Sequence, residues 1–205
     1  MNAIILAGGR ASRMGSCDKA FLKIGRNAII KRQLKILKEI FKEIFIVTNS
    51  PNKYRNVKEV SVITDTIPHQ GPLGGIYSGL MASDSFYNFV VACDMPFING
   101  ELIKYMIKNK DGYDVIIPKI DKKRHPLFGI YSKDCIHIIE KMLKDGRLKI
   151  SNMFPKVKTH FILKKVAGRF DKKILSLINI NTKEDLAEAN FIYSNDNDLD
   201  GYNSP

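Results

Sequence analysis

The sequence lacks the cysteine and histidine patterns of a zinc or disulfide-bonded protein, and it lacks the long apolar segments of a secreted or membrane protein. Its three cysteines, Cys17, Cys93 and Cys135, lie far apart, with no CxxC pair and no histidines at ligand spacing. This argues against a zinc site and a disulfide framework, and we expect free thiols. No apolar run approaches the roughly 20 residues of a membrane helix, and the N-terminus lacks a signal peptide's basic start and cleavage site. We therefore expect a cytoplasmic protein without membrane contact.

Acidic residues are fewer than basic residues in this chain. Lysine and arginine total 33 against 21 acidic residues, which gives a formal net charge of +12. Such an excess suits either nucleic acid or a small polyanionic ligand. The lysines are dispersed and no aromatic RNA-binding motif occurs, so we expect a phosphate-bearing small ligand and no nucleic acid. A solvated basic surface is the alternative explanation for much of the charge.

Short apolar runs alternate with helix-period segments over the first 120 residues. We expect strands at residues 2–7, 43–48, 60–64, 89–93 and 114–118, and helices at 27–41, 75–83 and 101–110. This alternation predicts βαβ units and a fold of the α/β class. The expected architecture is a three-layer αβα sandwich around a mostly parallel, Rossmann-like sheet.

The rest of the chain is less regular. Residues 127–131 predict an antiparallel strand, and residues 133–144 predict a helix. A last helix is expected at 182–192, where Thr182 and Asp185 are spaced as in a capping box. Residues 157–166 and 175–180 fit no clear element. We expect one domain over residues 1–193 and a disordered, polar tail over residues 194–205.

Three polar or glycine-rich positions directly follow expected strands. Gly8 and Gly9 follow the first strand, Asn49 follows the second, and Asp94 follows the strand at 89–93. In open parallel sheets, ligands bind beyond the carboxyl ends of the strands. We therefore expect these positions to converge on one site.

The loop after the first strand has the residues that a triphosphate requires. Gly8 and Gly9 let backbone N–H groups approach a phosphate closely, and Arg13 and Lys19 add cations. The spacing is neither that of a Walker A loop nor that of a GxGxxG fingerprint. A Gly-Gly pair alone is more often a tight turn, but the cations at these offsets favour a phosphate site.

Asp94 is the candidate metal ligand. It follows an apolar strand directly and precedes Pro96 by two positions, which places it at the expected ligand-binding edge. Magnesium prefers one or two carboxylates together with substrate phosphate oxygens. An isolated aspartate would more often be a helix cap, but the strand and the neighbouring loops favour function.

Residues 6–22 resemble the LAGGxxxRMGxxDKxxL signature of nucleotide-sugar-type nucleotidyltransferases, closest to its version in the molybdenum cofactor guanylyltransferases. Asp65 followed by GPLGG at 71–75, Asp94 in a CDxP context, and the segments at 125–131 and 178–186 are also similar to that family. The resemblance spans about residues 2–190. Gly74 departs from it, since alanine is common at that position.

The resemblance implies a fold of the nucleotide-diphospho-sugar transferase type and transfer of GMP from GTP to the terminal phosphate of molybdopterin or Mo-molybdopterin. Pyrophosphate is released and Mg²⁺ is the cofactor. Molybdenum-insertion and acceptor proteins are further partners that the family suggests. The implied nucleotide-binding residues are Leu6, Ala7, Gly8, Gly9, Lys19, Asn49, Asp65, Gly71 and Asp94. The implied catalytic residues are Arg13, Lys19 and Asp94, with Asp94 as metal ligand, and the implied acceptor contacts are Asn179 and Asn181.

The sequence is also compatible with other functions. A molybdopterin cytidylyltransferase or a sugar-phosphate nucleotidyltransferase would share the first loop, although Asp65 and the NINT segment favour guanylyl transfer. A non-catalytic nucleotide sensor or RNA-binding protein would use the basic surface alone. Asn49 is otherwise a turn residue, and Asn179 and Asn181 fit turn and cap chemistry equally well.

Overall fold

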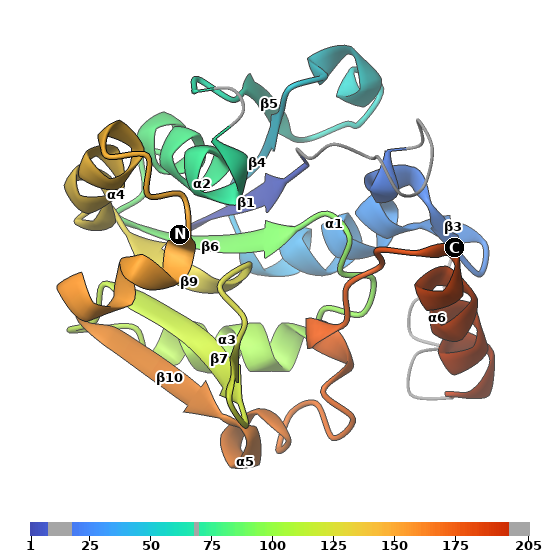
Figure 1. The fold of residues 1–205 in the computed structure, drawn as a ribbon. Helices are drawn as coiled ribbons and strands as arrows, with labels where there is room; N and C mark the ends of the chain where they lie inside the picture. Colours follow the sequence, from blue (N-terminus) through green and yellow to red (C-terminus); the bar gives the residue numbers. More distant parts are fainter. Residues whose placement is uncertain (8–17, 68–69, 197–205) are drawn as a thin grey trace.

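The computed structural model describes residues 1–7, 18–67 and 70–196, and its centre is an eight-stranded sheet (Figure 1). The strand order is β10-β7-β9-β6-β1-β4-β5, with β8 paired to β7. The strands are β1 (Asn2–Leu6), β4 (Ile44–Thr48), β5 (Ser61–Thr64), β6 (Tyr87–Ala92), β7 (Val115–Ile120), β8 (Lys123–Arg124), β9 (Phe128–Ser132) and β10 (Thr159–Leu163). Neighbours among β6, β1, β4 and β5 are parallel, whereas β9 is antiparallel to both β6 and β7. The predicted mostly parallel sheet and its antiparallel strand are confirmed.

Helices cover both faces of the sheet. They are α1 (Ile29–Ile40), α2 (Gly71–Ala82), α3 (Gly100–Lys108), α4 (Cys135–Lys144), α5 (Lys164–Ala167) and α6 (Lys183–Asn195). Short 3₁₀ helices occur at η1 (Lys19–Phe21), η2 (Pro51–Tyr54), η3 (Ile150–Asn152), η4 (Phe154–Lys156) and η5 (Leu175–Leu177). A two-stranded hairpin, β2 (Lys23–Ile24) with β3 (Asn27–Ala28), packs against α6 (Figure 1). In the described ranges, no helix combines the length and the apolar character that crossing a membrane requires.

Successive side chains of the central strand β1 point to opposite faces of the sheet, and this explains the three layers of helix, sheet and helix. In β1, Ala3 and Ile5 face the core shared with α1 and α3, whereas Ile4 and Leu6 face the core shared with α2 and α4. A strand covered on both faces reads as a continuous apolar run, as this one does. The approach of α2 to β1 requires glycine at Gly79, since a Cβ there would lie 2.6 Å from Ile4 Cγ2.

Some element boundaries differ from the predicted ones. The expected helix at 27–41 begins with β3, and α2 begins at Gly71, four residues before the predicted start at Gly75. The last helix extends to Asn195, so residues 194 and 195, expected in a disordered tail, are helical instead. The polar composition of this stretch does not show that Asp196 is buried and accepts a hydrogen bond from Lys173 at 2.9 Å, which holds the end of the helix. Residues 197–205 lie outside the described part of the chain.

Candidate active site

The carboxyl ends of four parallel strands meet at one edge of the sheet. The pairing register places Leu6 beside Val47 and Ala92, and Thr48 beside Thr64. Ala7, Asn49, Asp65 and Asp94 follow these strand ends, so they lie along the edge of the sheet at which the sequence predicts a ligand site. Gly8, Gly9 and Arg13, which were also predicted at this edge, lie outside the described residues.

Asp94 is the centre of a hydrogen-bond network that joins three distant parts of the chain. Its Oδ2 lies 3.1 Å from Lys19 Nζ, and its Oδ1 accepts a hydrogen bond from Asn179 Nδ2 at 2.7 Å. Lys19 Nζ also donates to Asn181 Oδ1 at 2.8 Å. The structure thus brings together Lys19, Asp94, Asn179 and Asn181, which were predicted from three separate sequence features. We call these four residues the Asp94 network.

The Asp94 network is partly buried but reachable by a ligand. The Lys19 side chain is 24% exposed and the Asp94 side chain is 15% exposed. A charge pair in such a position is screened by salt much less than a surface pair. The remaining exposure leaves room for phosphate or metal to contact either group.

The segment that carries Asn179 and Asn181 is held by the start of α6. The Thr182 hydroxyl accepts from Asp185 N, and the Asp185 carboxylate accepts from the N–H groups of Thr182 and Asn181, at 2.9 and 2.6 Å. The predicted capping box is confirmed, and these N–H donors lower the pKa of Asp185. The cap uses the Asn181 backbone, while both asparagine side chains bond to Lys19 or Asp94.

Asp65 lies at the end of β5 with one carboxylate oxygen committed to the protein. Its Oδ1 accepts from Ser78 Oγ at 2.8 Å and from the N–H of Ile67 at 3.2 Å. Within the described ranges, no residue donates to Oδ2. Gly71 begins α2 beside this loop with a φ of +62°, a conformation that favours glycine.

The backbone of the β1 end is largely committed to the sheet. The Ala7 N–H donates to Val47 O at 2.8 Å, and Leu6 O accepts from Cys93 N at 3.0 Å. A nucleotide contact by Leu6 or Ala7 must therefore use another group, such as the Ala7 carbonyl. Asn49 has an exposed side chain at the end of β4.

The described residues offer little metal-binding chemistry besides Asp94. They contain no cluster of three or more His, Cys, Asp or Glu side chains that could hold an ion. Cys93, directly before Asp94, is a buried free thiol whose pKa is raised by burial and then by the Asp94 charge. It is therefore neutral near pH 7 and unsuited to act as a thiolate ligand or nucleophile. Cys135 is also free and buried, and Cys17 lies outside the described residues.

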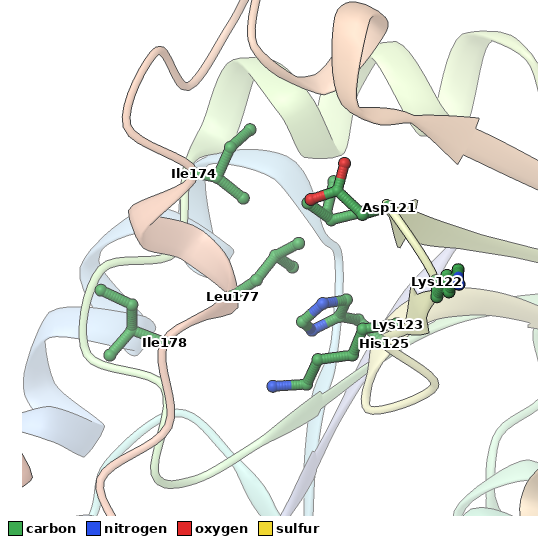
Figure 2. A pocket seen from close by; sticks show the side chains of 8 residues that line it. Asp121, Lys122, Lys123, His125, Ile174, Leu177 and Ile178 are labelled. Carbon is green, nitrogen blue, oxygen red and sulfur yellow. The ribbon is translucent and has the colours of Figure 1, made fainter.

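A pocket of about 420 Å³ lies beside the segment that carries Asn179 (Figure 2). Ile174, Leu177 and Ile178 form one apolar side, and Lys123 and His125 line the other. Ile178 directly precedes Asn179, so one segment borders both the pocket and the Asp94 network. Burial, together with the Lys123 charge, lowers the pKa of His125 to about 4.

We expect His125 to make the protein less stable in mild acid. The folded state holds its pKa at about 4 against 6.5 for an ordinary histidine. Between these values the unfolded chain binds a proton that the folded chain does not, so stability is full above pH 6.5 and is lost as pH falls toward 4. The loss amounts to about 1–2 kcal/mol for this half-buried group, after allowance for solvent screening. Urea unfolding of the wild type and His125→Gln at pH 7 and 4.5 measures it, and equal pH dependence of the two proteins would contradict it.

Gln33 is a residue of the site that the sequence analysis missed. It lies on α1, fully buried, and its Nε2 donates to Ala92 O at 2.8 Å and to Met95 O at 3.0 Å. A signal was present, since Gln33 falls on the same helix face as Ile30, Leu34 and Leu37. A polar residue on an apolar helix face needs buried hydrogen-bond partners.

The MobA-like NTP transferase domain model matches residues 3–156, which include the strand ends, Lys19, Asp65 and Asp94. The chain belongs to this family. A probable molybdenum cofactor guanylyltransferase of Pelotomaculum thermopropionicum is 37% identical over 192 residues, covering 94% of this chain and 93% of that protein. One of Clostridium perfringens is 41% identical over 189 residues, covering 88% and 91%.

The fold is also shared with MobA-like proteins of known structure. The crystal structure of molybdopterin-guanine dinucleotide biosynthesis protein A from Archaeoglobus fulgidus matches with a TM-score of 0.82 at 26% identity. The match covers 95% of this chain and 99% of that one. The predicted fold class and the resemblance to molybdenum cofactor guanylyltransferases are therefore confirmed.

Proposed function

We propose that this MobA-like chain transfers GMP from GTP to the terminal phosphate of molybdopterin or Mo-molybdopterin and releases pyrophosphate. The observation that carries the proposal is the Asp94 network at the carboxyl edge of the sheet, where a cation and a carboxylate lie 3.1 Å apart. Relatives that align over most of the chain carry the name molybdenum cofactor guanylyltransferase. The network and these names support the same chemistry.

The proposed reaction needs no protein nucleophile. A terminal phosphate oxygen of the acceptor forms a bond to the α-phosphorus of GTP, and the bond from that phosphorus to the α–β bridging oxygen breaks. The attacking phosphate is already anionic near neutral pH, so no general base is required. The protein's task is then to position two polyanions and to offset the charge that develops on the departing pyrophosphate. Lys19 is the described residue placed to do the latter, with Arg13 as a second candidate.

Asp94 has the properties of a magnesium ligand. Its Oδ2 already contacts one cation, the Lys19 ammonium, and its side chain remains partly accessible. Magnesium typically uses one or two carboxylates plus phosphate oxygens and water, so Asp94 can serve as its carboxylate ligand. Bound there, Mg²⁺ would act as a Lewis acid toward the phosphate oxygens.

Asp65 suits a guanine base. Ser78 and the Ile67 N–H hold its Oδ1, which fixes the direction of the carboxylate and leaves Oδ2 for a ligand. The guanine edge offers two neighbouring donors, N1–H and N2–H₂, that a carboxylate accepts. Cytosine presents no equivalent pair of donors, so this residue favours GTP over CTP.

We assign the acceptor to the side of Asn179 and Asn181. The adjoining pocket combines an apolar wall at Ile174, Leu177 and Ile178 with Lys123 and the neutral His125. A flat heterocycle can pack on the apolar wall while an anionic group contacts Lys123. Since Ile178 and Asn179 are adjacent, such a ligand would extend toward Asp94.

Measuring pyrophosphate release with GTP, CTP, UTP and ATP tests the proposal. With Mg²⁺ and the pterin acceptor present, we expect kcat/KM for GTP to exceed the others by on the order of 100-fold or more, because a polar site leaves unpaired groups with the wrong base. Turnover only with CTP or UTP would instead identify a cytidylyltransferase or sugar-phosphate enzyme. Release with none of them, together with salt-sensitive RNA binding, would support a non-catalytic protein.

A further inference from the structure

The turn that carries Asp94 is held from beneath by one buried amide. Gln33 Nε2 donates to Ala92 O and Met95 O, the carbonyls that flank Cys93 and Asp94, at 2.8 and 3.0 Å. Gln33 itself is fully buried in the middle of α1, a helix packed against the sheet. A single side chain thus ties both ends of the turn to a rigid element.

Backbone bonds hold the same turn from two other directions. Cys93 N donates to Leu6 O at the end of β1, and Ile180 N donates to Asp94 O, at 3.0 and 2.9 Å. Gln33 is the side-chain member of this set. Without it, Ala92 O would keep the N–H of Met95, at 3.4 Å, as a donor, whereas Met95 O would have no donor among the described residues. Within the described residues, Gln33 Oε1 is buried without a hydrogen-bond partner. A buried amide that leaves its own oxygen unsatisfied is destabilising, so its donors are the feature that accounts for its presence.

We propose that Gln33 is a positioning residue that fixes the direction of the Asp94 carboxylate toward the metal–nucleotide. This inference rests on the proposed function, because it assumes that Asp94 is the metal ligand. Gln33 does not touch the substrate, and it acts only through the backbone of the turn. Supporting residues of this kind typically change metal affinity or activity by roughly 10- to 100-fold when they are replaced.

Gln33→Met is the main test, since methionine has a similar shape and no hydrogen-bond donor. The probe is Mn²⁺ binding in the presence of a non-hydrolysable GTP analogue, followed by electron paramagnetic resonance. We expect metal affinity to fall by about 10-fold or more and kcat to fall similarly. The KM for GTP at saturating metal should change little, because Gln33 does not contact the nucleotide.

Asn88→Leu is the matched control. Asn88 is also fully buried, its Nδ2 donates to the backbone carbonyl of Ser85 at 2.8 Å, and its Oδ1 likewise has no partner among the described residues. It lies at the opposite end of β6, in the strand that leads to Asp94. Both variants should melt earlier than the wild type, but Asn88→Leu should bind Mn²⁺ within about twofold of it.

Gln33→Glu provides a second test, the pH dependence of metal affinity. It also replaces Gln33→Met if that variant does not fold. A protonated glutamic acid still donates one bond to the turn, whereas the ionised form faces two carbonyl oxygens. Burial raises the pKa of such an acid, so metal affinity relative to wild type should recover as pH falls. A merely structural role would produce no such pH profile in a variant that is folded throughout.

Failure of the proposed function can be distinguished from failure of the positioning role of Gln33 by using Asp94→Asn as a reference. If Asp94→Asn binds the Mn²⁺–nucleotide as well as the wild type, the proposed function fails at its metal site. If Asp94→Asn loses binding while Gln33→Met equals both the wild type and Asn88→Leu, the positioning role of Gln33 is wrong.

Discussion

Asp94→Asn should lower the rate of GMP transfer by on the order of 1000-fold, equivalent to about 4 kcal/mol of transition-state stabilisation. Asparagine keeps the shape of the side chain but removes the charge that would hold a metal against the phosphates. The measurement is single-turnover pyrophosphate release at saturating GTP, over a range of Mg²⁺ concentrations. Excess Mg²⁺ should restore little of the rate.

The same substitution should leave the protein folded. Asn179 and Lys19 donate to the two oxygens of Asp94, and an amide can accept only one of these bonds. The lost bond costs about 1–3 kcal/mol, and each kcal/mol lowers the melting temperature by about 2–4 °C in a domain of this size. Asp84→Asn is the control, because Asp84 accepts from Asn2 at 3.0 Å in a different hydrogen-bond group. Activity above a tenth of wild type in Asp94→Asn would exclude Asp94 as an essential ligand.

The part of the site that could be read from the sequence is the part that local patterns determine. Residues 89–93 are apolar and end at a carboxylate, so the strand and the edge at which Asp94 lies followed from periodicity and sheet topology. The loop residue Lys19 and the aspartate Asp65 were found through spacing and resemblance. Each of these signals lies within about 20 residues of sequence.

Long-range pairing was beyond the sequence patterns. Asn179 donates to a carboxylate 85 positions away, and Asn181 accepts from a lysine 162 positions away. Nothing local to the NINT segment separates these contacts from ordinary turn and cap chemistry, which the Asn181 backbone also makes. The packing of α6 on the hairpin of β2 and β3, together with the hydrogen bond from Ile180 N to Asp94 O, holds this segment at the sheet edge.

The sequence patterns failed to identify Gln33 and Asp196 as buried residues for the same physical reason. Gln33 is polar in a helix whose other buried residues, apart from Arg32, are apolar, and Asp196 is acidic at the end of a polar stretch. Composition alone assigns such residues to the surface. Each forms hydrogen bonds to specific partners inside the fold: Gln33 Nε2 donates to two turn carbonyls, and Asp196 accepts from Lys173.

Lys19→Met should lower kcat by about 100- to 1000-fold, as expected when a positioned donor to developing charge is removed. The reason is that Lys19 is the described cation beside Asp94, where the pyrophosphate would depart. The same change should strengthen Mn²⁺ binding several-fold, because the ammonium and a metal ion would share Asp94 Oδ2. Both Lys19→Met and Gln33→Met should lower kcat, but metal binding should become tighter in Lys19→Met and weaker in Gln33→Met. Steady-state kinetics and metal titration on the same preparation measure both quantities.

Lys38→Met is the control for loss of positive charge. Lys38 forms an ion pair with Glu59 on the surface, and exposed pairs contribute little to stability. Its replacement should leave kcat and metal affinity within about twofold of wild type. If Lys19→Met kept normal turnover at high Mg²⁺, Lys19 would serve only to neutralise Asp94 in the metal-free protein. Charge on the departing pyrophosphate would then have to be offset by another cation, for which Arg13 is the candidate from the sequence.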